Sequence, residues 1–145
     1  MAKPINLRAL TWKDYGISED RVQELKYFAM QYKEKKHKTR KSSKSPAAAD
    51  DHRLQRMRND LRIIEEAARS AAVAGGYPNA WKVILVSMAE DKNFQEAEAW
   101  AASKNSPLPW AQADFYAVRR AAFCTLDYLQ LKSQLEDTER RKDNG

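Results

Sequence analysis

Side chains suited to binding another molecule recur along one predicted helix in the last third of the chain. At steps of four, three and one residues, its apolar stripe is flanked by Gln112, Tyr116, Arg119 and Arg120. Glutamine can pair with the edge of adenine and arginine with that of guanine, and arginine and tyrosine also bind phosphate oxygens. The pattern predicts a surface that contacts double-stranded DNA. The alternative is that both arginines only solvate a core helix whose interior includes Tyr116.

The other reactive residue types do not converge in the sequence. His37 lies within a run of lysines and His52 at a predicted helix start, and neither has a second ligand at the i, i+4 spacing of a helical zinc site. Cys124 lies beside an apolar stripe, where a small core residue is expected. The sequence predicts a non-enzymatic protein without catalytic residues, metal or cofactor. As the single cysteine, Cys124 also excludes an internal disulfide and favours the reducing cytoplasm.

The net charge of the chain is concentrated in one segment. The chain has 145 residues, with 26 Lys and Arg against 20 Asp and Glu, and residues 33–45 hold seven of these cations and one acid. A run of like charges mixed with serine and followed by Pro46 predicts a flexible basic linker over residues 37–50. The cations expected to contact phosphate are Lys35, Lys36, Lys38, Arg40, Lys41 and Lys44. The alternative is a solvated connector.

The composition predicts an all-α fold. Hydrophobic residues make up 43% of the chain, with only 4 Gly and 5 Pro, so the turns of an all-β sandwich are missing. Apolar periodicity predicts a small bundle of about four to five helices. Their expected positions are 18–36, about 51–74, from 78 to about 90, a short helix from 94, and about 110 to beyond 131. Ser18 and Asp50 or Asp51 are candidate N-caps, and Gly75 with Gly76 ends the second helix.

These elements suggest four consecutive parts of the chain. They are an N-terminal helical segment (1–36), the basic linker (37–50), a helical domain (51–132) and a polar, frayed tail (133–145). The last two helices, separated by the sequence SKNSPLP, predict a pair resembling a helix-turn-helix with a long turn. The longest apolar stretch, residues 83–86, is too short to span a bilayer, and residues 1–12 lack the apolar run of a signal peptide. We therefore expect a soluble cytoplasmic protein with no membrane partner.

Both ends of the chain and part of its middle resemble a family of small proteins encoded by Firmicutes phages and prophages. The C-terminal motif is matched by Pro109, Phe115, Tyr116, Arg119, Arg120, Phe123, Leu126 and Asp127. Near the start, similar stretches are Tyr15-Gly16-Ile17-Ser18, Glu24-Leu25, Tyr27-Phe28 and Gln31-Tyr32, and in the middle Ile64-Glu65 with Ala67-Ala68. The chain departs from the family in carrying Trp110 where a cysteine is common and in its longer SKNSP turn. Because such proteins are similar to phage late-gene transcriptional regulators with a helix-turn-helix, the resemblance implies a DNA-binding regulator.

Two further functions fit the same sequence. A protein-interaction module could use tryptophans near element ends, Trp12, Trp100 and Trp110, as anchors for a host or phage protein. A DNA-packaging recognition subunit would share the basic charge and assemble as a ring, and an oligomer is compatible with each hypothesis. The leading hypothesis remains a phage or prophage DNA-binding protein that regulates transcription.

Overall fold

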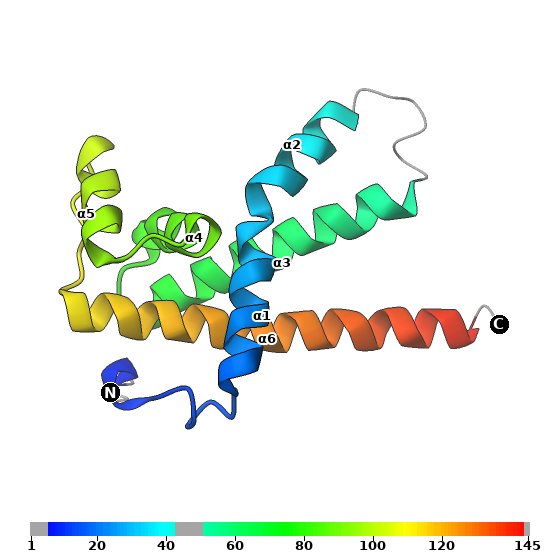
Figure 1. The fold of residues 1–145 in the computed structure, drawn as a ribbon, viewed down its shortest axis with the longest axis horizontal. Coiled ribbons are helices and arrows are strands. Elements are labelled where there is room, and N and C mark those ends of the chain that lie inside the picture. Colours follow the sequence, from blue (N-terminus) through cyan, green and yellow to red (C-terminus); the bar gives the residue numbers. More distant parts are fainter. Residues whose placement is uncertain (1–5, 43–50, 144–145) are drawn as a thin grey trace.

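The described part of the protein is helical and contains no strand. A computed structural model describes residues 6–42 and 51–143, and the predicted all-α bundle is confirmed (Figure 1). Its α-helices are α1 (Glu19–Met30), α2 (Tyr32–Ser42), α3 (His52–Ala74), α4 (Trp81–Glu90), α5 (Phe94–Ser103) and α6 (Gln112–Asp143). Two short 3-10 helices, η1 (Leu7–Ala9) and η3 (Pro78–Ala80), precede α1 and α4. Lys44 and the rest of residues 43–50 lie outside the described chain.

Helices α3 and α6 form the largest interface between two elements, and the other helices pack around it. Alanines at 67, 68, 71 and 72 of α3 are fully buried, and their small side chains permit a close approach of neighbouring backbones. Larger side chains fill the space around them, among them Phe115, Phe123 and Leu126 of α6. Leu25 of α1 and Ile84 of α4 belong to the same core, so the N-terminal segment predicted as a separate part shares one core with the helical domain.

The helix ends follow local chemistry, as the sequence predicted. The Ser18 hydroxyl accepts a hydrogen bond from the Arg21 backbone N–H, and the Asp51 carboxylate accepts from Arg53 and Leu54. These bonds satisfy donors that a helix leaves unpaired in its first turn. Helix α3 ends at Gly75, and Gly76 has φ +86°, a conformation that glycine adopts without strain.

The predicted boundary between the first helix and the flexible linker is wrong. Helix α1 ends at Met30, and α2 then runs through residues 37–42, which were expected to be linker. The cause is a side of α2 that packs on the bundle: Tyr32 and Thr39 are buried, and Lys35 is ion-paired with Asp60 of α3 at 3.0 Å. Lys38 also pairs with Glu34 one turn earlier, which stabilises the helix itself.

The C-terminal tail also differs from its prediction. Residues 133–143 continue α6 as a regular helix that extends beyond the bundle (Figure 1). Glu136 and Asp137 each have an arginine four residues later, the spacing at which opposite charges support a helix. The last turn carries Arg140, Arg141 and Lys142, cations that the helix dipole favours at this end. None of the helices described is long and apolar enough to cross a membrane.

Replacing Gly75 with alanine should destabilise the fold. A Cβ atom at this position would lie 2.6 Å from Cγ2 of Val118 and 3.1 Å from Nε1 of Trp110. The backbone conformation (φ −80°) suits alanine, so the cost comes from overpacking and should be about 1–3 kcal/mol in the free energy of unfolding. Urea denaturation followed by circular dichroism measures it. In the double variant Gly75→Ala/Val118→Ala the loss should be smaller than the sum of the single losses; additive losses would contradict a clash at this site.

Candidate nucleic-acid interface

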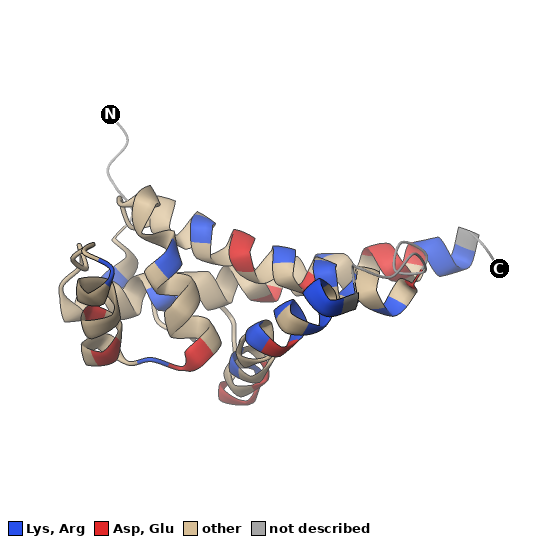
Figure 2. Cartoon of the chain, turned by 90° about the horizontal axis from the view of Figure 1, so that it is seen from above, with Lys and Arg blue, Asp and Glu red and all other residues tan. Residues whose placement is uncertain are grey.

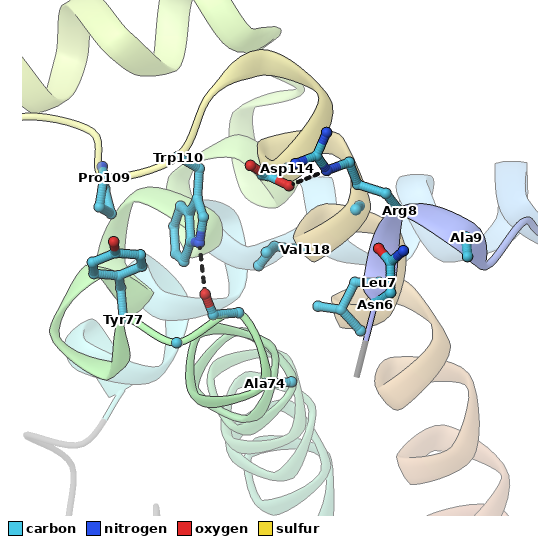
Figure 3. A pocket seen from close by; sticks show the side chains of 13 residues that line it. Asn6, Leu7, Arg8, Ala9, Ala74, Tyr77, Pro109, Trp110, Asp114 and Val118 are labelled. Carbon is cyan, nitrogen blue, oxygen red and sulfur yellow. Dashed lines mark hydrogen bonds and ion pairs between the residues drawn. The ribbon is translucent and has the colours of Figure 1, made fainter. Parts of the chain in front are cut away.

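The start of α6 is fixed against the end of α3 by Trp110. Its buried indole donates a hydrogen bond from Nε1 to the Gly75 carbonyl oxygen at 3.0 Å (Figure 3). The ring of Tyr77 meets the indole edge-on, with ring centroids 5.8 Å apart. Because Trp110 immediately precedes the helix, this contact sets where the first turn of α6 lies. Trp110 is therefore a core residue and does not serve as an exposed anchor.

A cleft separates this junction from the N-terminal segment. It is lined by residues 6–9, by Gly75 to Tyr77 at the end of α3, and by Trp110 and Val118. Arg8 lies at this cleft, where its Nε atom pairs with the Asp114 carboxylate at 2.6 Å (Figure 3). The Arg8 side chain is still largely exposed. The pair neutralises the one acid in the first turn of α6.

Of the four α6 residues predicted to contact DNA, three lie around a shallow depression on the first turns of the helix. Gln112, Tyr116 and Arg120 line it together with Ala113 and Arg8. Sequence reasoning missed Arg8, because residues 7–9 are far from α6 in the chain and only the fold brings them together. Gln112 is exposed and extends from the first residue of the helix.

Two of these residues also hold the fold together. The Tyr116 hydroxyl accepts a hydrogen bond from the Phe94 backbone N–H at 3.0 Å, which satisfies a donor in the first turn of α5. Arg120 donates from Nε to the Leu10 carbonyl oxygen at 3.2 Å and so ties the N-terminal segment to α6. Both side chains are half-buried.

Arg119 is not part of this depression, so the predicted set of four does not form one surface. Its side chain is only 13% exposed, and its guanidinium pairs with Asp91 at 2.9 Å. Asp91 ends α4 in the left-handed conformation (φ 50°). The guanidinium also lies 5.5 Å from the centre of the Phe123 ring, and its Nε atom is buried without a hydrogen-bond partner. For Arg119 the geometry therefore favours a structural role.

Helices α5 and α6 occur in the order predicted for the helix-turn-helix-like pair. Asn93 and Glu96 form a reciprocal capping box at the start of α5, and the rings of Phe94 and Phe115 meet edge-on at 5.8 Å between centroids. Residues 104–111, with prolines 107 and 109, separate the two helices. Proline lacks the backbone N–H that a helix needs, and it disfavours the helical conformation of the residue before it. The two prolines therefore explain why the connection is long.

Two of the cations predicted for the basic linker point inward. The Lys35 side chain is 16% exposed, pairs with Asp60 and lies 4.4 Å from the centre of the Phe28 ring. Lys36 donates to the Tyr32 hydroxyl at 3.3 Å. Tyr32 in turn donates to the Glu65 carboxylate, and burial with this acceptor raises the pKa of the phenol well above its usual range. These contacts attach α2 to α3.

The remaining cations form a surface that continues onto α3. Lys38, Arg40 and Lys41 of α2 are exposed, and so are Arg53, Arg56 and Arg58 at the start of α3. We call α2 together with residues 51–62 the basic arm. In this arm α2 holds six cations and one acid, and residues 51–62 hold four arginines and two acids. Its net charge of +7 exceeds the +6 of the whole chain (Figure 2).

Sequence reasoning missed the arginines of α3 because it treated everything outside residues 33–45 as one neutral block. Acids in the later helices balance these arginines in the sum; two of them, Glu136 and Asp137, line a groove with Arg56, together with Arg140 and Arg141. The signal was present: four arginines occur between positions 53 and 62. Counting charge over each predicted half-helix would have found it.

The other candidate reactive groups stay apart in the fold. His37 and His52 are exposed, and no group of three or more His, Cys, Asp or Glu that could hold a metal ion occurs among the described residues. Cys124 is half-buried, and burial, followed by the nearby Asp127, raises the pKa of its thiol. A raised pKa leaves less thiolate at neutral pH, which disfavours a nucleophilic role.

Comparison of the chain with protein-family models, with curated proteins and with solved structures finds no match. The resemblance to phage proteins therefore depends on the motifs given above, and the arguments about function depend on the described residues.

Removing the Tyr116 hydroxyl should weaken the contact between α5 and α6. In Tyr116→Phe the Phe94 N–H loses its acceptor, and we expect a loss of about 1 kcal/mol in the free energy of unfolding. Thermal and urea denaturation measure it. Tyr27→Phe, in an exposed tyrosine of α1, is the matched control and should leave stability unchanged. Equal stability of the two variants would show that the hydroxyl has no structural role.

Proposed function

We propose that the chain is a non-enzymatic DNA-binding protein of phage or prophage origin that regulates transcription. One observation carries the proposal: the basic arm holds a net charge of +7 along α2 and the first half of α3, in a molecule whose remaining charges nearly cancel. DNA presents a dense row of phosphates, and a cluster of exposed lysines and arginines is the surface that binds it. The phage origin rests on the motif resemblance.

On this proposal the two predicted groups of residues would have different roles. In the basic arm, Lys41, Arg53, Arg56 and Arg58 are exposed and would bind backbone phosphates without reading sequence. Lys35 would act by holding α2 against α3 through Asp60, and Lys36 is bonded to Tyr32 of its own helix. Lys38 and Arg40 belong to the exposed part of the arm.

Base contacts would come from the depression at the start of α6. Gln112 carries the amide that can pair with adenine, and Arg8 and Arg120 are guanidinium groups on the same depression. The charge of Arg8 is partly neutralised by its ion pair with Asp114. Gln112 is therefore the residue best placed for a selective contact with a base. Arg119 would contribute through its pair with Asp91, as a positioning residue.

A second candidate function is binding of a protein partner, and Trp100 favours it. Trp12 packs against Phe123 and Trp110 is buried, whereas Trp100 lines a pocket together with Val83 and Leu108. Two lysines, 82 and 104, line this pocket, and none of its lining residues is acidic. An apolar side chain within an acidic peptide would fit such a pocket. A DNA-packaging subunit would use the same basic arm as the regulator.

Neutralising the basic arm should weaken DNA binding and its salt dependence. We expect the variant Lys41→Gln/Arg53→Gln/Arg56→Gln/Arg58→Gln to lower the slope of log K against log salt by roughly 3 to 4, because up to four phosphate contacts are lost. Fluorescence anisotropy with a labelled DNA duplex across a salt series measures this slope. Gln112→Ala should leave the slope unchanged and reduce the difference in affinity between duplexes of different sequence.

The matched control removes four exposed cations elsewhere: Lys13→Gln/Lys82→Gln/Lys104→Gln/Lys132→Gln has the same net charge as the arm variant. It should bind DNA nearly as the natural chain does. Equal losses in both variants would mean that only overall charge matters. Absence of binding by the natural chain at moderate salt would refute the DNA-binding function and favour the protein partner.

A further inference from the structure

The outer face of α6 carries an apolar stripe beyond the bundle. Tyr128, Leu131 and Leu135 follow one another at steps of three and four residues, and their exposed fractions are 63%, 49% and 66%. At about 100° per residue these positions share one side of the helix. Leu126 is buried and Leu129 is half-buried against the core, on the side of α6 opposite this stripe. The stripe therefore faces away from α3.

Earlier along α6 the same face is covered by the chain's own N-terminal segment. Ala117, Arg120 and Cys124 precede the stripe at helical steps of three and four residues. Ala117 lines a cleft with Leu7, and Arg120 bonds the Leu10 carbonyl. Cys124 is close enough to Tyr15 to influence the pKa of its phenol. The covering ends near Cys124, and the stripe begins at the next turn.

We propose that a second copy of this chain covers the stripe, with the two α6 helices antiparallel. In a parallel pair, each copy's N-terminal segment would occupy the face on which the partner helix has to lie. In an antiparallel pair centred near residue 133, the overlap runs from about residue 124 to 142 of each copy. This is the part of α6 that the N-terminal segment leaves uncovered.

Within this overlap, the residues of one α6 helix are complementary to those of the antiparallel α6 helix of the second copy. Leu131 faces Leu135 of the second copy, and Tyr128 faces Thr138, as in the alternating layers of an antiparallel coiled coil. On one flank Arg141 of the second copy approaches Asp127, whose carboxylate is already paired with Arg21 of its own chain at 2.7 Å, so no like charges meet there. On the other flank the Lys132 side chains of the two copies approach each other. Their flexible stems can direct both ammonium groups to water.

The length of α6 is consistent with this pairing. Residues 134–142 are exposed in a single chain, so this end of α6 is supported there by charge spacing and by continuity with the earlier helix, and gains no packing. A partner helix on Leu131 and Leu135 would supply this packing. A second copy supplies that helix without any other protein.

Sedimentation equilibrium over a wide range of protein concentration tests the pairing. The natural chain should show reversible monomer–dimer behaviour, and Leu131→Glu/Leu135→Glu should lower the association constant by at least about tenfold. Tyr27→Glu/Val73→Glu, at two equally exposed positions off the stripe, adds the same charge and should dimerise like the natural chain. Circular dichroism checks that each variant is folded. A natural chain that stays monomeric, or a stripe variant that dimerises normally, would overturn the proposal.

Disulfide trapping tests the orientation. In a Cys124→Ser background, Gln134→Cys should form a disulfide-linked dimer under mild oxidation. The reason is that position 134 of one copy lies close to position 134 of the other, at the two-fold axis of the antiparallel pair. Leu131→Cys in the same background should link slowly, since the two residues are offset along the axis by about one helical turn. Rapid linking through position 131 without linking through 134 would show a parallel pair and overturn the antiparallel arrangement.

Discussion

The close packing of α3 against α6 is the contact on which the other elements depend. Buried alanines of α3 allow the two backbones to approach, and Gly75 leaves room for Val118 and Trp110 at the point where α3 ends. Trp110 then fixes the first turn of α6, and that turn positions Gln112. The N-terminal segment is attached to the same helix through Arg120. A substitution at this junction is therefore expected to shift Gln112 in the candidate site, although the substituted residue does not contact Gln112.

The balance of charges divides the molecule into a nearly neutral body and a basic arm. In the body, Arg21 pairs with Asp127, Arg119 with Asp91 and Arg8 with Asp114, each within 3 Å. In the arm, acids are too few to match the cations. Exposed surface pairs contribute little to stability, and this distribution matters mainly for the electrostatic field outside the protein. On the proposed function, a phosphate backbone would be drawn to the arm.

Local signals in the sequence predicted the helices well, whereas tertiary partners decided the rest. Ser18, Asp51 and Gly75 mark helix ends because their effect depends on neighbouring residues only. Helix α2, which includes residues 37–42, is held by contacts of Tyr32 and Lys35 with another helix, so the charge run alone suggested a linker. The separation of Arg119 from Gln112 depends on Asp91, 28 residues away. No spacing rule along α6 contains that information.

Helix α6 combines tasks that place conflicting demands on its residues. Its middle must be apolar towards α3, its first turns must carry polar groups, and its far end must stay helical without the bundle. The order of residue types meets these demands in turn: Gln112 and Tyr116 first, Phe123 and Leu126 in the core, then Leu131 and Leu135 facing outward. Exposed leucines oppose solubility in a lone chain, so their occurrence together on one face of α6 favours a surface that is covered in the working assembly. The same helix would then join the two proposed interfaces rigidly, because no break in α6 separates them.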